Sequence, residues 1–455
     1  MKHIWTIFIL LGCILLASCK SSSSSQSVQS SVAQLTSFSF AKNDSFPGLA
    51  EAKFYIKELI DTGLVYNRDS IRYGTRLDSV VPKFTFYTTP YTTSLRFSDP
   101  SKGWDTIFAL HYNDTLNFNH EYIYLTVLSA DQSTTKVYRI LPTVHQVDPD
   151  LYAWNTLSES VHPVADETQQ MLFLGDRMLI FANDGLQTRL YTSLDLGKTW
   201  SSATTVSTLP TDCRVRTIVA MDDMLYYVQG TSLYTSTDGV TWTTTDCASL
   251  VSTFHSALLA WIDRVWVIGE RADGTLAFFT VSGTTVEDSE ITLDEAFPVS
   301  GFAAVAFTST SDRARAMVMG GISRKGAYLN SRWNLEYSLA HKTMAMTNYA
   351  KEQPAAPCVI GASLTWYNRQ LCLFGGVDAE GSLHYTDGLY VSNDEGMHWS
   401  LLDTTKCHLP EGLTPRYNAS MCAHDNTIYI YGGQSRTRSF SDLYSTRLQS
   451  IDWDK

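Results

Sequence analysis

Short and almost wholly apolar runs recur along the last two-thirds of the chain, separated by polar segments rich in turn-forming residues. A short run that is apolar at every position is typical of a strand buried on both faces. We interpret these runs as the second strands of repeated sheet units, because their spacing is roughly the 40 to 50 residues of a propeller blade. They lie at residues 178–182, 224–228, 264–269, 316–321, 371–376 and 428–433.

A turn motif with a fixed order of Ser, Asp, Gly and Trp follows three of these runs. The aspartate can accept backbone N–H groups, the glycine can adopt positive φ without strain, and the tryptophan can hold the turn against the sheet. We expect this turn between the third and fourth strands of a blade, as a structural device. Its residues are Ser193, Asp195, Gly197 and Trp200; Ser236, Asp238, Gly239 and Trp242; and Ser392, Asp394, Gly396 and Trp399.

Residues 37–146 show a different pattern, with seven short β-type runs separated by turn-rich pieces. Such spacing predicts an immunoglobulin-like β-sandwich. The runs lie at residues 37–41, 54–60, 80–87, 94–97, 107–112, 123–129 and 137–144. The predicted fold is therefore all-β, with this sandwich followed by a six-bladed β-propeller over residues 151–455. Seven blades are the alternative, and residues 152–157 are a candidate outer strand for the last blade.

The first residues of the chain predict where the protein resides. Residues 1–18 contain a short hydrophobic segment typical of a secretory signal, too short to span a membrane. Its end, Leu16-Ala17-Ser18-Cys19, resembles a bacterial lipobox, which implies lipid on Cys19; an ordinary cleaved signal is the alternative. Lys20 then implies outer-membrane sorting, with display on the cell surface left open. The Ser-rich residues 19–36 predict a flexible tether.

Charge and composition narrow the classes of partner. The net charge of −12, without a basic cluster, argues against nucleic acid. The eleven histidines have no metal-ligand spacing, and we expect no metal or cofactor. Cysteines 213, 247 and 407 follow their blades at similar places, too far apart to be bridged. We therefore expect free thiols, with three disulfides as the alternative, for Cys213, Cys247, Cys358, Cys372, Cys407 and Cys422.

Several of these motifs resemble known families. The three turns resemble the Asp boxes of sialidases and many other propellers, and the Gly-Gly ends of the last three second strands resemble kelch repeats. The whole arrangement resembles uncharacterised cell-envelope lipoproteins of Bacteroidota-type bacteria. That resemblance implies architecture and location, and it implies no activity.

A sialidase-like glycan hydrolase is the sharpest enzymatic alternative. It requires three arginines, a Tyr nucleophile with a Glu partner, and an acidic general acid. The nearest match to the aromatic-Arg-Ile-Pro signature is Tyr138-Arg139-Ile140-Leu141-Pro142, which has an inserted Leu and precedes every blade. No Gly-x-Ser-x-Gly elbow or phosphate loop is present. We therefore predict that the protein is not an enzyme.

The connections between the second and third strands differ among the blades. In blades four to six this connection is longer, at residues 322–333, 377–388 and 434–442. These long connections combine aromatic and polar side chains suited to a sugar or a protein partner. We predict a lipid-anchored module that binds a glycan or an envelope protein through this face; a structural scaffold is the remaining alternative. The candidate binding residues are Arg324, Lys325, Tyr328, Trp333, Glu380, His384, Tyr385, Arg436, Arg438 and Phe440.

Overall fold

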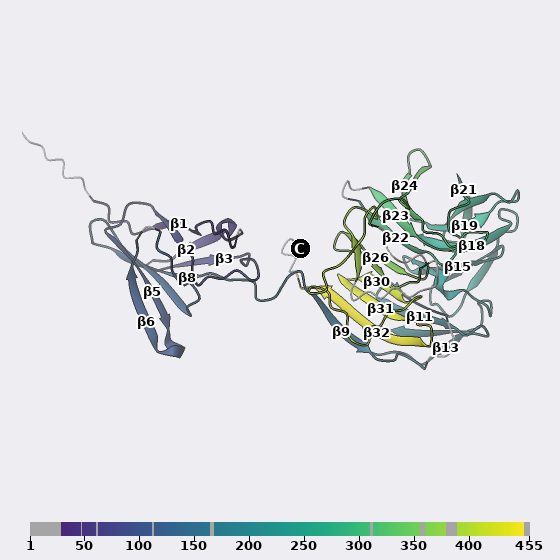
Figure 1. Ribbon diagram of the computed structural model, residues 1–455, viewed down its shortest axis with the longest axis horizontal. Coiled ribbons are helices and arrows are strands. Elements are labelled where there is room, and N and C mark those ends of the chain that lie inside the picture. Colours follow the sequence, from purple (N-terminus) through teal and green to yellow (C-terminus); the bar gives the residue numbers. More distant parts are fainter. Residues whose placement is uncertain are drawn as a thin grey trace, which may run out of the picture. The chain divides into compact units, whose positions relative to one another are not determined.

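A computed structural model describes residues 29–449, except 47, 61, 112, 164–167, 310–312, 355–359 and 379–388. The predicted signal segment, Cys19, Cys358 and Trp453 lie outside the described residues. The chain divides after Val147 into two compact units, and each is built almost entirely of strands (Figure 1). None of the helices in the described ranges is long and apolar enough to cross a membrane.

The N-terminal unit contains a two-stranded sheet, β1-β4, and a six-stranded sheet in the order β2-β3-β8-β7-β5-β6 (Figure 1). One hydrophobic core, which includes Phe38, Leu95 and Ile140, joins the two sheets. Each of the seven predicted runs overlaps a strand; the immunoglobulin-like assignment stays a prediction. The strands are β1 (Leu35–Phe40), β2 (Phe54–Glu58), β3 (Thr62–Asn67), β4 (Pro82–Phe86), β5 (Thr92–Asp99), β6 (Trp104–Ala109), β7 (Tyr122–Leu128) and β8 (Thr135–Leu141).

Strand β3 is the element of this unit that the sequence pattern missed. Its first residues, Thr62 and Gly63, follow an aspartate and match a turn, yet β3 pairs in parallel with β8. Gly63 is required there, because a methyl group on its Cα would overlap the ring of Tyr138 on β8. A glycine inside a strand often marks such a close approach.

The described residues from 148 onward form six four-stranded antiparallel sheets, here called blades 1 to 6 in chain order (Figure 1). Blade 1 is β10 (Thr168–Leu174), β11 (Arg177–Asn183), β12 (Thr188–Ser193) and β13 (Thr204–Val206); blade 2 is β14 (Val219–Met221), β15 (Met224–Gln229), β16 (Ser232–Ser236) and β17 (Thr243–Asp246); blade 3 is β18 (Thr253–Ala260), β19 (Val265–Glu270), β20 (Leu276–Ser282) and β21 (Thr285–Thr292). Blade 4 is β22 (Ala303–Thr308), β23 (Ala314–Met319), β24 (Arg332–Ser338) and β25 (Thr343–Asn348); blade 5 is β26 (Ser363–Tyr367), β27 (Gln370–Phe374), β28 (Tyr390–Ser392) and β29 (Ser400–Leu401); blade 6 is β30 (Ser420–His424), β31 (Thr427–Gln434), β32 (Ser439–Leu448) and β9 (Tyr152–Ser158).

The apolar runs form the second strands, as predicted. They become β11, β15, β19, β23, β27 and β31, each second in its sheet. Neighbouring blades share hydrophobic cores: Phe181 of blade 1, for example, packs in one cluster with Leu225 and Tyr227 of blade 2. Because both faces of a second strand are covered in this way, its central positions are apolar, and polar residues such as Arg177 and Glu270 occur at its ends.

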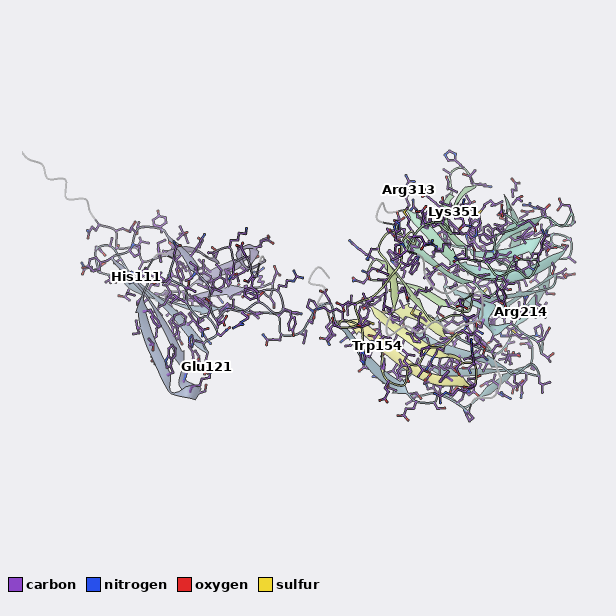
Figure 2. All side chains as sticks on the ribbon, viewed as in Figure 1. His111, Glu121, Trp154, Arg214, Arg313 and Lys351 are labelled. Carbon is purple, nitrogen blue, oxygen red and sulfur yellow. The ribbon has the colours of Figure 1, made fainter. Side chains whose placement is uncertain are left out.

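Strand β9, from the start of this unit, completes the last blade. It pairs antiparallel with β32, with Trp154 (Figure 2) opposite Thr446 and Tyr152 opposite Leu448. The prediction for residues 152–157 is thus confirmed. Pairing the first strand with the last sheet leaves β32 without an open edge, which is how closed β-architectures avoid unpaired backbone groups.

The three Ser-Asp-Gly-Trp turns lie between third and fourth strands and have the predicted geometry. In blade 1, Ser193 Oγ donates to Asp195 Oδ1 at 2.8 Å and accepts from the Gly197 amide at 2.8 Å. Trp200 Nε1 donates to the Gly197 carbonyl at 3.1 Å. The same three bonds recur in blade 2, at Ser236, Asp238, Gly239 and Trp242, and in blade 5, at Ser392, Asp394, Gly396 and Trp399.

These turns also join neighbouring blades. A methyl group at Gly197 would overlap Cδ2 of Leu443 in blade 6, and one at Gly396 would overlap the end of Met317 in blade 4. Trp399 is fully buried in the same cluster as Met317. The motif therefore fixes the packing between blades as well as its own hairpin.

The cysteines within the described ranges are free thiols, as predicted. Cys213, Cys247, Cys372 and Cys407 are buried, and Cys422 is half-buried. Burial raises the pKa of the Cys372 thiol to about 12, so it stays protonated at neutral pH. The four buried thiols act as small core residues.

Candidate binding site

The connections between second and third strands share one end of the blades with the links between consecutive blades, because the strands alternate in direction. We call this end the loop face. The Ser-Asp-Gly-Trp turns lie at the opposite end. The loop face holds all the described candidate residues that lie in connections.

The connection of blade 6 is shorter than predicted. Strands β31 and β32 stay paired as far as Gln434 and Ser439, so only residues 435–438 form the connection, as many as residues 184–187 in blade 1. The expected long loop over 434–442 is therefore wrong. Blade 4 keeps a long connection, residues 320–331. Glu380, His384 and Tyr385 of blade 5 lie outside the described residues.

In blade 4, Arg324 bridges to blade 3. Its Nη1 donates to the Gly274 carbonyl at 2.7 Å and lies 3.5 Å from Glu270 Oε1, and its Nη2 pairs with Glu295. Lys325 Nζ lies 3.4 Å from Glu295 Oε2. Because these groups already have partners, Arg324 mainly holds the long connection of blade 4 against blade 3. Tyr328 is exposed.

Two predicted rim residues belong to the core. Trp333 lies in β24, is 9% exposed, and packs with its ring centroid 5.6 Å from that of Phe297. Phe440 lies in β32 and is 8% exposed, with the guanidinium carbons of Arg416 and Arg438 at 3.9 and 4.5 Å from its ring centroid. Both side chains are packed within their blades, so neither ring is exposed on the loop face, although Phe440 also lines the pocket described next.

The remaining candidates of blade 6, Arg436 and Arg438, are exposed in its hairpin. Arg438 borders a pocket of about 540 Å³ on the loop face. The structure thus separates the predicted residues into a blade 4 group and a blade 6 group. The pocket is lined by Thr156, Glu159, Ser160, Pro410, Glu411, Gly412, Arg438, Ser439, Phe440, Ser441, Asp442 and Tyr444.

The floor of this pocket, here called the blade 6 pocket, includes Gly412, Asp442 and Tyr444, which belong to a polar network around the fully buried Arg416. Arg416 Nη1 donates to Asp442 Oδ1 at 2.6 Å and to the Gly432 carbonyl at 2.9 Å. Its other nitrogens donate to the carbonyls of Thr414 and Gly412. A buried charge with every donor satisfied is rigid, and removal of either partner leaves an unpaired charge.

Tyr444 belongs to the same network. Its hydroxyl donates to Asp442 Oδ2 at 3.2 Å, and burial raises its pKa to about 12. It therefore remains a neutral hydrogen-bond donor at neutral pH. Sequence analysis did not predict this network, because Arg416 and Asp442 lie on different segments and match no motif.

The rim of the blade 6 pocket is chemically different from its floor. Glu159, Glu411 and Arg438 are exposed, and their side chains have neither hydrogen bond nor ion pair with the described residues. The rim therefore offers two carboxylate acceptors and one guanidinium donor to a ligand.

A second cavity, of about 430 Å³, lies along the axis of the blades and is lined by the inner strand of each blade. Arg216 is the charged residue among its described lining residues. The three arginines with a Tyr and a Glu that the hydrolase alternative requires are not among them. The Tyr138–Pro142 match lies in and just after β8, in the N-terminal unit. The described part of the chain also lacks a group of three metal-ligating side chains.

Sheets repeated around a cavity, with hydrogen-bonded turns between their third and fourth strands, define a β-propeller preceded by a separate β unit. The chain belongs to the DUF6242 family: the DUF6242 beta propeller domain matches residues 148–455, and the N-terminal domain of unknown function of the same family matches residues 22–141.

Individual relatives share smaller parts of the sequence. Acyl-CoA-binding domain-containing proteins 5 and 4 of Arabidopsis thaliana are 30% and 29% identical over 96 residues, which is 21% of this chain and 14% of each of those proteins. A solved structure titled "Structure of YjhT" aligns with a TM-score of 0.47 and 11% identity, covering 66% of this chain and 99% of that one.

Proposed function

We propose that this protein is a lipid-anchored envelope module that binds a glycan in the blade 6 pocket. The observation that carries the proposal is the contrast between a floor with satisfied hydrogen bonds and a rim where Glu159, Glu411 and Arg438 have no hydrogen bond or ion pair with the described residues. A site of this kind needs no rearrangement before a ligand binds, which lowers the cost of binding.

The chemistry of the rim suits a polyhydroxylated ligand. Each sugar hydroxyl can donate to a carboxylate and accept from a guanidinium. Pockets of roughly 300 to 1,000 Å³ with a few fixed polar groups are typical ligand sites. Because Phe440 is covered by Arg416 and Arg438, we expect hydrogen bonds rather than ring stacking to dominate binding.

The lipid anchor and outer-membrane location remain part of the proposal. Support comes from the lipobox-like sequence ending at Cys19 and from the Ser-rich segment that follows it. A tether of this composition would let the folded units reach a ligand away from the membrane surface.

The test is a glycan array with the purified full-length chain in detergent, followed by calorimetric titration of the bound glycan. Glu411→Gln and Arg438→Ala should each weaken binding at least tenfold, because a charged hydrogen bond contributes about 1.5 to 3 kcal/mol. The matched control is Lys325→Ala, an exposed cation of blade 4 that should leave the affinity unchanged.

The proposal is wrong if no glycan binds, or if the pocket variants bind as tightly as the unmodified protein. Capture of an envelope protein that depends on Glu411 and Arg438, without any glycan binding, would assign the pocket to a protein partner. Thermal unfolding of each variant checks that the loss of binding does not come from unfolding.

A further inference from the structure

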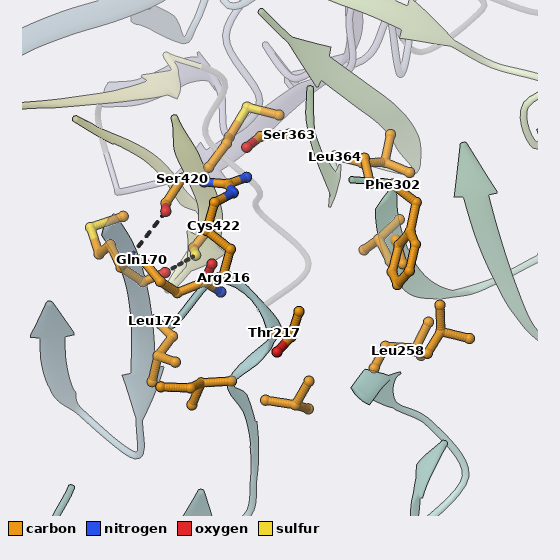
Figure 3. A pocket seen from close by; sticks show the side chains of 18 of the residues that line it. Gln170, Leu172, Arg216, Thr217, Leu258, Phe302, Ser363, Leu364, Ser420 and Cys422 are labelled. Atoms are coloured by element: carbon orange, nitrogen blue, oxygen red, sulfur yellow. Dashed lines mark hydrogen bonds between the residues drawn. The ribbon is translucent and has the colours of Figure 1, made fainter. Parts of the chain in front are cut away.

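The central cavity has two chemically different sides. Figure 3 shows the apolar side chains of Leu258, Phe302 and Leu364 on one side, and the polar groups of Arg216, Ser420 and Cys422, together with Leu172, on the other. A ligand that fits both sides would have a polar end and an apolar body. A cavity of about 430 Å³ limits this ligand to a small molecule.

The charge in the cavity comes from Arg216, which precedes the inner strand of blade 2. Its Nη1 donates to the Asn418 carbonyl at 2.5 Å and makes longer contacts, at 3.4 Å, with the Gln169 and Ala419 carbonyls. Its Nη2 and Nε have no partner among the described residues, and it forms no ion pair with a described carboxylate. Burial lowers its pKa to about 10, so it remains charged at neutral pH.

A chain of backbone hydrogen bonds fixes the position of this arginine. The Gly361 amide donates to the Gly301 carbonyl at 3.1 Å, and the Asn418 amide donates to the Gly361 carbonyl at 2.7 Å. These three residues have φ of 65°, 65° and 56° and come just before the inner strands of blades 4, 5 and 6. The Asn418 carbonyl then accepts from Arg216, which holds one guanidinium edge and leaves the rest unengaged.

Arg216 is half-buried, so its charge is partly removed from water, and a bound counter-charge would offset that cost. A guanidinium pairs best with a carboxylate, through two parallel hydrogen bonds. We propose that the central cavity binds a small organic acid, with its carboxylate on Nη2 and Nε of Arg216 and its apolar body against Phe302, Leu258 and Leu364. This site is separate from the blade 6 pocket and does not rest on the proposed glycan binding.

The probes are acetate, butanoate and 3-phenylpropionate, titrated calorimetrically into the full-length protein. Affinity should rise as the apolar part of the acid becomes larger. The amide 3-phenylpropanamide, which lacks the charge, should bind at least tenfold more weakly than 3-phenylpropionate.

Arg216→Gln should lower the affinity for 3-phenylpropionate at least tenfold. The matched control is Arg177→Gln, because Arg177 also donates to a backbone carbonyl, at 2.9 Å from Thr237 O, and does not line the cavity.

A second variant covers the case in which Arg216→Gln does not fold. Thr217 lines the cavity (Figure 3), and Thr217→Phe should fill it and block binding while Arg216 stays in place. The proposal is overturned if none of the three acids binds, if acid and amide bind equally, or if both cavity variants bind like the unmodified protein. Binding of an acidic peptide without any binding of the small acids would also overturn it. Glu411→Gln should not alter acid binding, which separates this test from that of the blade 6 pocket.

Discussion

Two structural constraints require glycine at position 197: a positive φ and a close contact with the neighbouring blade. The φ of Gly197 is 86°, and a methyl group on its Cα would overlap Leu443 of the neighbouring blade. We expect Gly197→Ala to lower the free energy of unfolding by about 1 to 2 kcal/mol through backbone strain and by a further 1 to 3 kcal/mol, roughly, through overpacking. Chemical denaturation followed by tryptophan fluorescence measures the loss.

Gly185→Ala separates these two contributions. Gly185 has nearly the same φ, 85°, but no atom lies within 4 Å of an added methyl group. This variant should show the backbone cost alone. Equal losses in the two variants would mean that contact between blades at the turn contributes nothing.

Asp195 gives the same turn a pH dependence. Hydrogen bonds from the Thr199 hydroxyl and amide and from Ser193 lower its pKa from 3.8 to about 2. The folded protein holds this proton less tightly than the unfolded chain, so the aspartate stabilises the fold above about pH 4 and loses that contribution as the pH falls toward 2. Asp195→Asn should reduce the slope of stability against pH in this window, measured by thermal unfolding at stepped pH; an unchanged slope would contradict it.

Single residues also show why the predicted exposure of some side chains was wrong. Trp333 and Phe440 are aromatic residues within the predicted loops 322–333 and 434–442, and the sequence does not say whether an aromatic ring is exposed or packed. Trp333 is buried because it packs against Phe297, and Phe440 is buried because arginine side chains cover its ring. The turn residues were predictable because their hydrogen bonds are local.

At the scale of the element, strand β9 is the critical one, because it joins the start of the propeller to its end. Tyr152 is 4% exposed, its amide donates to the Lys406 carbonyl at 2.8 Å, and its ring packs in the core shared by blades 5 and 6. Tyr152→Ala should destabilise the propeller by about 3 to 5 kcal/mol, the usual cost of deleting a buried aromatic ring.

Asn155→Ala is the control for this change, since Asn155 lies on the same strand with an exposed side chain. It should alter the propeller's unfolding by less than about 0.5 kcal/mol, as exposed substitutions usually do. A Tyr152→Ala protein as stable as this control would show that β9 does not hold the last blade closed.

The sequence predicted the positions of the strands more reliably than their lengths. The apolar runs located the second strand of each blade, because burial on both faces leaves a continuous run of apolar residues in the sequence. The hairpin of blade 6 was too long in the prediction because its polar residues continue the β31–β32 pairing instead of forming a loop. Strand β3 was missed because its glycine serves a contact with Tyr138 from a distant segment.

At the scale of the whole molecule, the proposed lipid anchor would decide where the propeller acts. We expect Cys19→Ala to abolish incorporation of a labelled fatty acid and to move the protein from the membrane fraction to the soluble fraction of cells, because two or more acyl chains give stable anchoring. Cys13→Ala is the control and should retain both the label and the membrane location. Labelling that persists without Cys19 would contradict the lipobox interpretation.

The sequence by itself determined the repeat, the turn chemistry and the closing strand, because apolar runs and short-range hydrogen bonds leave their pattern in consecutive residues. Only the tertiary structure decided which side chains meet at the two cavities. Arg416 and Asp442 of the blade 6 pocket lie 26 residues apart, and Arg216 reaches a carbonyl 202 residues away. Such contacts depend on how the blades are placed around the axis, and no local pattern records that placement.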